Sequence, residues 1–195
     1  MTDDEQDVED LVKRAQMGDR AALGALYDRL AGRVYRFTLV RVGSRADAED
    51  LTQRIFLKMI EGLPRYQSRG IPFEAWLFRL ARNAVVDLLR ARRGHEPLET
   101  LTAARSPGRG PEESAELAAE FASVERAMKA LTATQQEVLA YRFMAGLTPR
   151  EVGLVMGKRE GTVRALQFRA LETLRRSLRR DAQGQNALPE AGFKP

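Results

Sequence analysis

The stretch LTPREVGLVMGKREGTVRALQFRALETLRR, residues 147–176, decides how the carboxyl-terminal part of this chain folds. Thr148 stands as an N-cap, Pro149 takes the first helical position, and Glu151 completes a capping box, so a helix begins here. Gly157 ends this helix, because glycine readily adopts the left-handed conformation of a helix stop. A second helix follows after a short turn. The pattern predicts a helix-turn-helix, which places its second helix in the major groove of DNA.

The second helix of this motif has one apolar face and one face rich in arginine. At about 100° per residue, the apolar face carries Val163, Leu166, Ala170, Leu171, Leu174 and Leu178. The opposite face carries Arg164, Phe168, Arg169, Glu172 and Arg176. An exposed aromatic among arginines suits contacts with base edges, such as a thymine methyl group. The alternative is an ordinary antiparallel helix pair with a solvated basic face.

Composition narrows the possible classes of protein. The 195 residues include no cysteine, which excludes disulfides, thiolate metal sites and thiol catalysis. The single histidine, His95, lies among glycine and proline, and no Gly-rich phosphate loop is present. No apolar run approaches the roughly 18 residues of a membrane span, and the acidic start MTDDEQDVED is unlike a signal peptide. We therefore expect a cytoplasmic protein that is not an enzyme and has no catalytic residue, metal or cofactor.

Charge is distributed unevenly along the chain. The formal net charge is +5 and the isoelectric point is about 9.9, yet residues 3–10 carry six acidic side chains and no basic one. The basic residues between 158 and 180 are Lys158, Arg159, Arg164, Arg169, Arg175, Arg176, Arg179 and Arg180. This polarity is typical of a carboxyl-terminal part that binds a polyanion.

Apolar residues recur at helical spacing throughout, so the predicted fold class is all-α. The helices are expected at about 5–17, 20–41, 45–62, 72–93, 115–130, 133–145, 149–156 and 160–181. Three prolines and three glycines interrupt residues 94–113, which indicates a flexible linker. We therefore expect two helical domains, 1–93 and 114–181, and a frayed polar tail at 182–195.

The expected helix at 45–62 begins at Ser44, a good N-cap. Its apolar stripe carries Ala48, Leu51, Ile55 and Met59. Its other side carries Asp50, Gln53, Arg54, Leu57 and Glu61. A leucine among polar residues suggests a protein-docking face, although one exposed leucine needs no such explanation.

The expected helix at 72–93 and the loop before it favour single-stranded nucleic acid. The apolar stripe of the helix carries Phe73, Trp76, Leu77, Leu80, Ala84 and Leu88, and we interpret Trp76 as a core residue. Its far side carries Arg79, Arg82, Arg90 and Arg93, with Asn83 at the edge. The loop LPRYQSRGI contributes Arg65, Tyr66, Gln67, Ser68 and Arg69. Tyrosine can stack on an unpaired base, arginine neutralises phosphate, and amide or hydroxyl groups read base edges. The alternative is a solvated basic surface.

Two segments together resemble a known family. DAEDLTQRIFLKMI (47–60) with PFEAWLFRLARNAVVDLLRARR (72–93) resembles region 2 of the extracytoplasmic-function (ECF) class of bacterial sigma factors. LTATQQEVLAYRFMAGLTPREVGLVMGKREGTVRALQFRALETLR (131–175) resembles region 4 of the same class. The resemblance implies a dissociable subunit of core RNA polymerase that binds the clamp helices of the largest subunit and the flap. It also implies promoter DNA as a partner, and a separate anti-sigma factor as a possible one.

The resemblance carries roles to positions of this chain. Polymerase docking falls to Asp50, Gln53, Arg54 and Leu57. Opening of the −10 promoter element, with capture of a flipped base, falls to Arg65, Tyr66, Gln67, Ser68, Arg69, Arg79, Arg82, Asn83 and Arg90. Reading of the duplex −35 element falls to Lys158, Arg159, Thr162, Arg164, Phe168 and Arg169.

Three positions depart from the family pattern. Arg54 stands where relatives often have an acidic or small residue, and Ala165 replaces a frequent serine. Arg159 replaces a serine that caps the second helix of the motif, which should cost that helix about 1 kcal/mol. Two rival interpretations remain open: a transcription regulator with a LuxR-like helix-turn-helix that does not dock on polymerase, and a helical adaptor that binds only protein.

Overall fold

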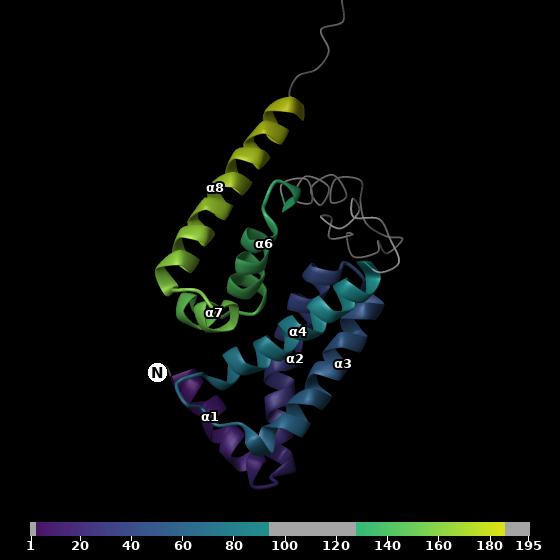
Figure 1. The fold of residues 1–195 in the computed structure, drawn as a ribbon, viewed down its shortest axis with the longest axis vertical. Helices are drawn as coiled ribbons and strands as arrows, with labels where there is room; N and C mark the ends of the chain where they lie inside the picture. The colour runs from purple at the N-terminus through teal and green to yellow at the C-terminus, as the bar shows by residue number, and fades with distance from the viewer. Residues whose placement is uncertain (1–2, 94–127, 186–195) are drawn as a thin grey trace, which may run out of the picture.

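The computed structural model describes residues 3–93 and 128–185, and this part of the chain is helical (Figure 1). The elements are α1 (Asp3–Gln16), α2 (Arg20–Val42), α3 (Arg45–Gly62), the 3₁₀ turn η1 (Leu63–Arg65), α4 (Phe73–Arg93), α6 (Ala133–Leu139), the π-helical turn η2 (Ala140–Met144), α7 (Pro149–Met156) and α8 (Glu160–Gln185). The predicted all-α fold is confirmed. The predicted linker at 94–113 and most of the predicted helix at 115–130 lie outside the described residues.

The helix boundaries follow from local capping chemistry. The Ser44 side chain accepts a hydrogen bond from the Asp47 amide and begins α3, as predicted. Thr148 and Glu151 form the predicted capping box of α7. Gly157 adopts a left-handed conformation (φ 65°) at the end of α7. Glycine takes this conformation without steric cost because it has no β-carbon.

The amino-terminal half of the structure, α1–α4, is a four-helix bundle. Helix α2 packs between α1 and α3, and α4 crosses α2 and α3 (Figure 1). The fully buried side chains at its centre include Leu26, Leu30, Val34, Ile55 and Met59. The salt bridge between Arg92 and Asp47 joins the end of α4 to the start of α3, and hydrogen bonds from Ser44 and Arg92 lower the pKa of the Asp47 carboxyl group.

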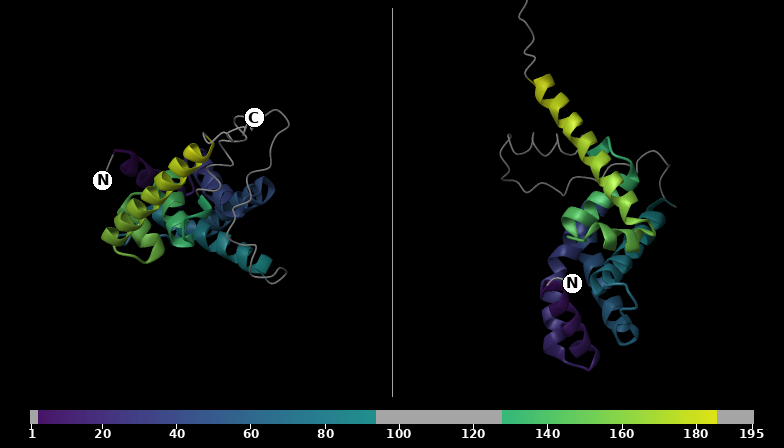
Figure 2. Two further views of the ribbon diagram at one scale, coloured as in Figure 1. Left: turned by 90° about the horizontal axis from the view of Figure 1, so that it is seen from above. Right: turned by 90° about the vertical axis from the view of Figure 1, so that its left-hand side faces the viewer.

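The carboxyl-terminal half, α6–α8, holds the helix-turn-helix. Helix α7 packs against the start of α8, and α6 also packs against α8. Ala170 of α8 is fully buried against Leu131 and Leu139, so α6 and α7 together hold the first half of α8. Beyond it α8 extends away from both halves of the molecule, as all views show (Figure 2).

The two halves share one continuous apolar core. Phe37 of α2 stacks on Tyr141 of η2 with ring centroids 4.8 Å apart, and Phe78 of α4 meets Phe37 edge-on at 5.6 Å. Val138 and Val155 of the carboxyl-terminal half belong to the same cluster. The two halves of the described chain therefore pack as one body in this structure.

Two features of the helices differ from the sequence prediction. Helix α4 packs against α2, α3 and α7, so Phe78, Ala81 and Val85 are buried beside the predicted stripe. Helix α8 continues to Gln185, beyond the predicted end at 181. None of the described helices is long and apolar enough to cross a membrane.

Candidate nucleic-acid interface

The turn of the helix-turn-helix depends on close backbone packing at Gly153. A β-carbon built at Gly153 lies 2.6 Å from the carbonyl oxygen of Lys158, which is closer than real contacts allow. The chain between α7 and α8 can therefore pass directly over α7 only because position 153 has no side chain. This contact fixes the angle at which α8 leaves the turn.

Gly153→Ala is expected to lower the free energy of unfolding by about 1–3 kcal/mol, because the backbone must shift to relieve the overlap. Urea denaturation followed by circular dichroism measures the change. Gly161→Ala is the matched control: its β-carbon meets nothing within 4 Å, and alanine there should stabilise α8 by about 0.5–1 kcal/mol. Equal effects of the two substitutions would contradict the packing described for the turn.

The outward face of α8 and the turn before it is exposed as predicted. We call it the reading face: Lys158, Arg159, Thr162, Arg164, Phe168 and Arg169, all exposed. Phe168 is 67% exposed, although it is a large apolar residue. The Arg164 guanidinium forms an ion pair of 2.6 Å with Glu160, which orients it along the helix surface. An aromatic ring flanked by guanidinium groups on the second helix of this motif can contact base edges and phosphates together.

Arg159 precedes the first residue of α8 and leaves that helix without a side-chain cap from this position. Its backbone carbonyl oxygen accepts hydrogen bonds from the amides of Thr162 and Val163. Its guanidinium group, however, contains only donors and cannot accept a hydrogen bond from the unpaired amides in the first turn of α8. Arg159→Ser should therefore raise the free energy of unfolding by about 1 kcal/mol. Thermal denaturation measures the effect, and an unchanged or lower melting temperature would contradict the assignment.

The structure corrects the prediction that the Tyr66 ring is free to stack on a base. Tyr66 is only 7% exposed, and its ring packs against Phe73 and Trp76 with centroids 5.3 and 5.1 Å away. Its hydroxyl donates to the carbonyl oxygen of Ile71 at 2.9 Å. Burial, followed by the nearby Glu9 carboxylate, raises the pKa of the Tyr66 hydroxyl. Tyr66 therefore anchors the loop in this conformation.

A pocket nevertheless lies where the loop meets α4. Its volume is about 340 Å³, and it is lined by Arg65, Tyr66, Gln67, Arg69 and Trp76. Four of these residues belong to the predicted base-capture set. Trp76, interpreted from the sequence as core, is only partly buried and contributes an aromatic wall. The lone tryptophan beside an arginine-rich loop was the signal that could have identified it.

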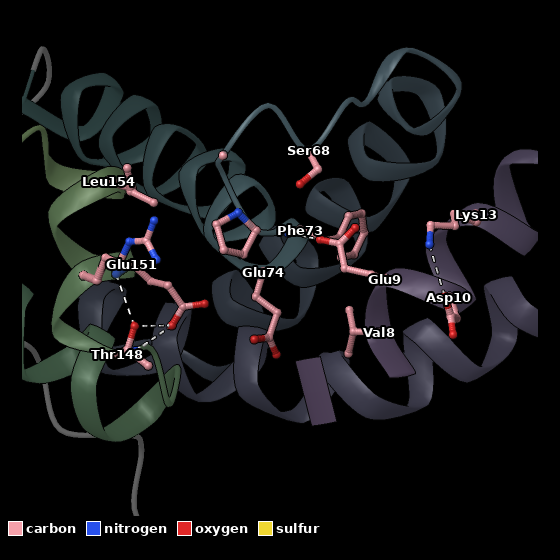
Figure 3. Close-up of a pocket in the computed structure, with 13 residues that line it drawn as sticks. Val8, Glu9, Asp10, Lys13, Ser68, Phe73, Glu74, Thr148, Glu151 and Leu154 are labelled. Carbon is pink, nitrogen blue, oxygen red and sulfur yellow. Dashed lines mark hydrogen bonds and ion pairs between the residues drawn. The ribbon is translucent and has the colours of Figure 1, made fainter. Parts of the chain in front are cut away.

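Two residues of α1 that the sequence did not indicate hold this loop in place. Gln16 donates from Nε2 to the carbonyl oxygens of Leu63 and Tyr66, at 2.9 and 2.8 Å. The Glu9 carboxylate accepts the first amide of α4, that of Phe73, at 3.2 Å (Figure 3). Helix α1 therefore fixes both ends of the segment 66–72, through Gln16 and Glu9.

The arginine band of α4 is divided by the structure. Asn83 and Arg90 are exposed as predicted. Arg79 instead donates to the carbonyl oxygen of Leu154 at 2.8 Å, and Arg82 forms a 2.7 Å salt bridge with Glu137. The prediction that all these arginines are free to support a DNA strand is therefore wrong for this conformation, because the carboxyl-terminal half occupies two of them.

The outer side of α3 is exposed as the sequence predicted. We call it the docking face: Asp50, Gln53, Arg54 and Leu57, all exposed. Leu57 is 60% exposed, and Ile60, one turn further along, is also exposed and apolar. Asp50 and Arg54 pair at 2.8 Å across one helical turn. Two apolar side chains surrounded by charged ones form a small surface suited to a protein partner.

Comparison with known proteins agrees with this arrangement. The Sigma-70 region 2 family matches residues 26–95, and the Sigma-70, region 4 family matches residues 127–176. The ECF RNA polymerase sigma factor BldN of Streptomyces coelicolor is 39% identical over 176 residues, covering 89% of this chain and 67% of that protein. The chain belongs to the ECF sigma factors of the sigma-70 family. The family directs RNA polymerase to promoters and into initiation, and its members are not enzymes.

A second relative supports the relationship along most of the chain, and a solved structure shares its fold. ShbA of Streptomyces griseus, another ECF sigma factor, is 38% identical over 186 residues, with 90% of this chain and 97% of ShbA covered. Among solved structures, CnrH in complex with the cytosolic domain of CnrY is similar in fold, with a TM-score of 0.66 and 24% identity. That alignment covers 88% of this sigma factor and 96% of CnrH.

Proposed function

We propose that this sigma factor binds polymerase, the −10 element and the −35 element through three separate surfaces of different chemistry. The docking face on α3 binds the clamp helices of the largest polymerase subunit. The 66–72 loop and the exposed side of α4 hold the single-stranded −10 element, and the reading face on α8 contacts the duplex −35 element. The observation that carries the proposal is the reading face, where a 67% exposed Phe168 lies among arginines on the second helix of a helix-turn-helix.

The proposed −10 site uses the pocket beside the loop. An extruded base enters between Trp76 and the polar loop residues, where an aromatic wall and hydrogen-bonding groups lie together. Tyr66 forms the floor of this pocket because it is buried against Trp76. Asn83 and Arg90, exposed on α4, contact the strand beyond the pocket.

Asn83→Ala is expected to slow promoter opening on duplex DNA much more than on a template already melted at the −10 element. The reason is that the few kcal/mol needed to unstack and unpair the base are already supplied in the melted template. Permanganate footprinting of the holoenzyme on both templates measures the difference. Because Asn83 is exposed, the fold should be unaffected. An equal loss on both templates would remove Asn83 from base capture.

The proposed partners extend beyond polymerase and DNA. Region 4 also contacts the polymerase flap, and the chain acts in the cytoplasm, where the polymerase works. RpoE of Bartonella quintana, similar in fold at a TM-score of 0.61, was solved in complex with the anti-sigma factor NepR. We propose a separate anti-sigma factor for this chain on that likeness.

Co-purification tests the proposed docking. The wild-type chain should elute with core polymerase in size-exclusion chromatography and should confer binding to promoter duplex that neither component shows alone. A chain that binds duplex tightly by itself and never associates with core would instead be a regulator of the LuxR-like kind. A chain that binds core polymerase but gives the complex no affinity for promoter duplex would be a protein adaptor.

A further inference from the structure

We propose that a cavity between α1, the 66–72 loop, α4 and α7 binds a linear aliphatic diamine, whose two ammonium groups contact the carboxylates of Glu9 and Glu151. We call it the α1–α7 cavity. None of its lining residues belongs to the docking face or the reading face. The inference does not depend on the proposed function, because it rests on contacts within the chain alone.

The α1–α7 cavity has the size and the lining of a small-molecule site. Its volume is about 480 Å³, and ligand pockets typically measure about 300–1,000 Å³. Such pockets combine a largely apolar wall with a few polar groups that orient the ligand. Glu151 of α7 and Glu9 of α1 lie on opposite sides of the cavity (Figure 3). The apolar part of the lining consists of Val8, Pro72, Phe73 and Leu154.

The Glu151 carboxylate is buried, and only one of its two oxygens is hydrogen-bonded. The residue is 5% exposed. Its Oε2 accepts hydrogen bonds from the amide and the hydroxyl of Thr148, both at 2.7 Å. Its Oε1 has no hydrogen-bond partner among the described residues and lies on the side of the carboxylate away from Thr148 (Figure 3). Buried polar atoms are nearly always hydrogen-bonded, so an unpartnered oxygen beside a cavity favours a donor supplied by a ligand.

The charges around the cavity are only partly balanced within the chain. Asp10 pairs with Lys13 at 3.2 Å, and Glu74 pairs with Arg33 of α2. Neither Glu9 nor Glu151 forms an ion pair within residues 3–93 and 128–185. The charged side chains of the lining are Glu9, Asp10, Lys13, Glu74, Arg150 and Glu151. Carboxylates therefore outnumber cationic groups by two, which favours a ligand with two positive charges.

Glu9 provides the second contact for such a ligand. Its Oε1 accepts hydrogen bonds from the Phe73 amide at 3.2 Å and from the Tyr66 hydroxyl at 3.4 Å. The other oxygen, Oε2, makes no hydrogen bond within the described part of the chain and stays available to a ligand. Arg150, the remaining cationic group of the lining, is exposed, so it can turn into solvent when a dication binds.

A linear diamine matches this arrangement better than other charged ligands. Each ammonium group offers three donors and no acceptor, and its hydrogen bonds to a carboxylate are charge-assisted. The methylene chain between the two ammonium groups loses its contact with water against the apolar lining. A compact metal ion does not fit, because no three acidic or histidine side chains of the described residues lie close enough together to hold one. An anion would be repelled by both carboxylates.

Isothermal titration calorimetry of the full chain with cadaverine, a linear diamine, tests the proposal without DNA or polymerase and at constant ionic strength. The heat should saturate at one molecule per chain. Pentylamine has the same carbon chain but a single ammonium group, so it should bind at least about tenfold more weakly, because one charged hydrogen-bonded contact is lost. Magnesium chloride of equal ionic strength should not displace cadaverine.

Three variants locate the bound diamine. Glu151→Gln and Glu9→Gln should each weaken cadaverine binding by about tenfold or more. Glutamine at position 151 can still complete the capping box of α7, and glutamine at position 9 can still accept the Phe73 amide, so both variants should fold. Glu49→Gln, the same change on the exposed side of α3, is the matched control and should bind cadaverine within about twofold of the wild type.

Melting temperatures give an independent measurement on the same chains. Cadaverine should raise the melting temperature of the wild type, because a ligand that binds only the folded chain stabilises it by mass action, and it should raise that of Glu151→Gln or Glu9→Gln much less. Melting without ligand shows whether either variant is damaged, in which case the other variant decides.

Four results would overturn the inference: no saturable binding of cadaverine, equal affinity for pentylamine, displacement by magnesium, or the same affinity in Glu49→Gln and both cavity variants. Failure of the proposed function would appear separately, as a chain that does not associate with core polymerase.

Discussion

Leu57→Arg is expected to abolish binding of the sigma factor to core polymerase. Leu57 is the apolar side chain of the docking face, and burial of an arginine at this position in the complex would force an unpaired guanidinium into an apolar contact. A buried charge without a partner costs about 3–5 kcal/mol, so the dissociation constant should rise by about two to four orders of magnitude. Titration of labelled sigma factor with core polymerase measures the change.

Met17→Arg provides the matched control for this substitution. Met17 is also a large apolar residue, 79% exposed, but it lies after α1 and outside the docking face. It should bind core polymerase as the wild type does. Both variants should keep their free energy of unfolding within about 0.5 kcal/mol, because neither side chain is buried. A Leu57→Arg chain that unfolds, or that binds core normally, would remove Leu57 from docking.

Phe168→Ala is expected to weaken binding of the holoenzyme to its preferred −35 duplex by about 1–3 kcal/mol, or about 5- to 150-fold. In the proposed complex the exposed ring contacts base edges, so a scrambled −35 duplex should lose much less. Competition binding with both duplexes measures the ratio. The substitution removes little buried surface, and the fold of α8 should be kept.

Comparison with Arg179→Ala distinguishes recognition of bases from binding of phosphates by the same helix. Arg179 is exposed toward the far end of α8, away from the turn. Its loss should weaken preferred and scrambled duplexes alike and lower the slope of log affinity against log salt by up to about one unit. If Phe168→Ala behaves in this way as well, Phe168 is not a base reader and recognition passes to Arg164 and Arg169.

Local chemistry made much of the fold predictable. Ser44, the Thr148 and Glu151 capping box, and the Gly157 stop act within a few residues of themselves, so their roles could be read from spacing alone. The exposed side of α3 and the reading face of α8 followed from helical periodicity for the same reason. Their side chains face solvent in this structure because no other segment among residues 3–93 and 128–185 covers them.

The errors arose where residues far apart in the chain meet. Tyr66 looked like a free aromatic, but Glu9 and Gln16, about fifty residues earlier, draw its loop against α1. Arg79 and Arg82 looked solvated because their partners lie 75 and 55 residues later. Periodicity within one helix cannot report such contacts. Both corrections concern the −10 surface, where the loop and α4 meet other elements.

In vitro transcription from a library of random promoter sequences, with core polymerase and this chain, tests most directly that the protein selects promoters and initiates from them. Sequencing of transcript 5′ ends should show starts at a fixed distance downstream of two shared elements, with no such starts from core alone or from core with Leu57→Arg. Phe168→Ala should relax the upstream element and Asn83→Ala the downstream one. Transcript starts that share no sequence element, or that do not depend on the chain, would contradict its function as a sigma factor.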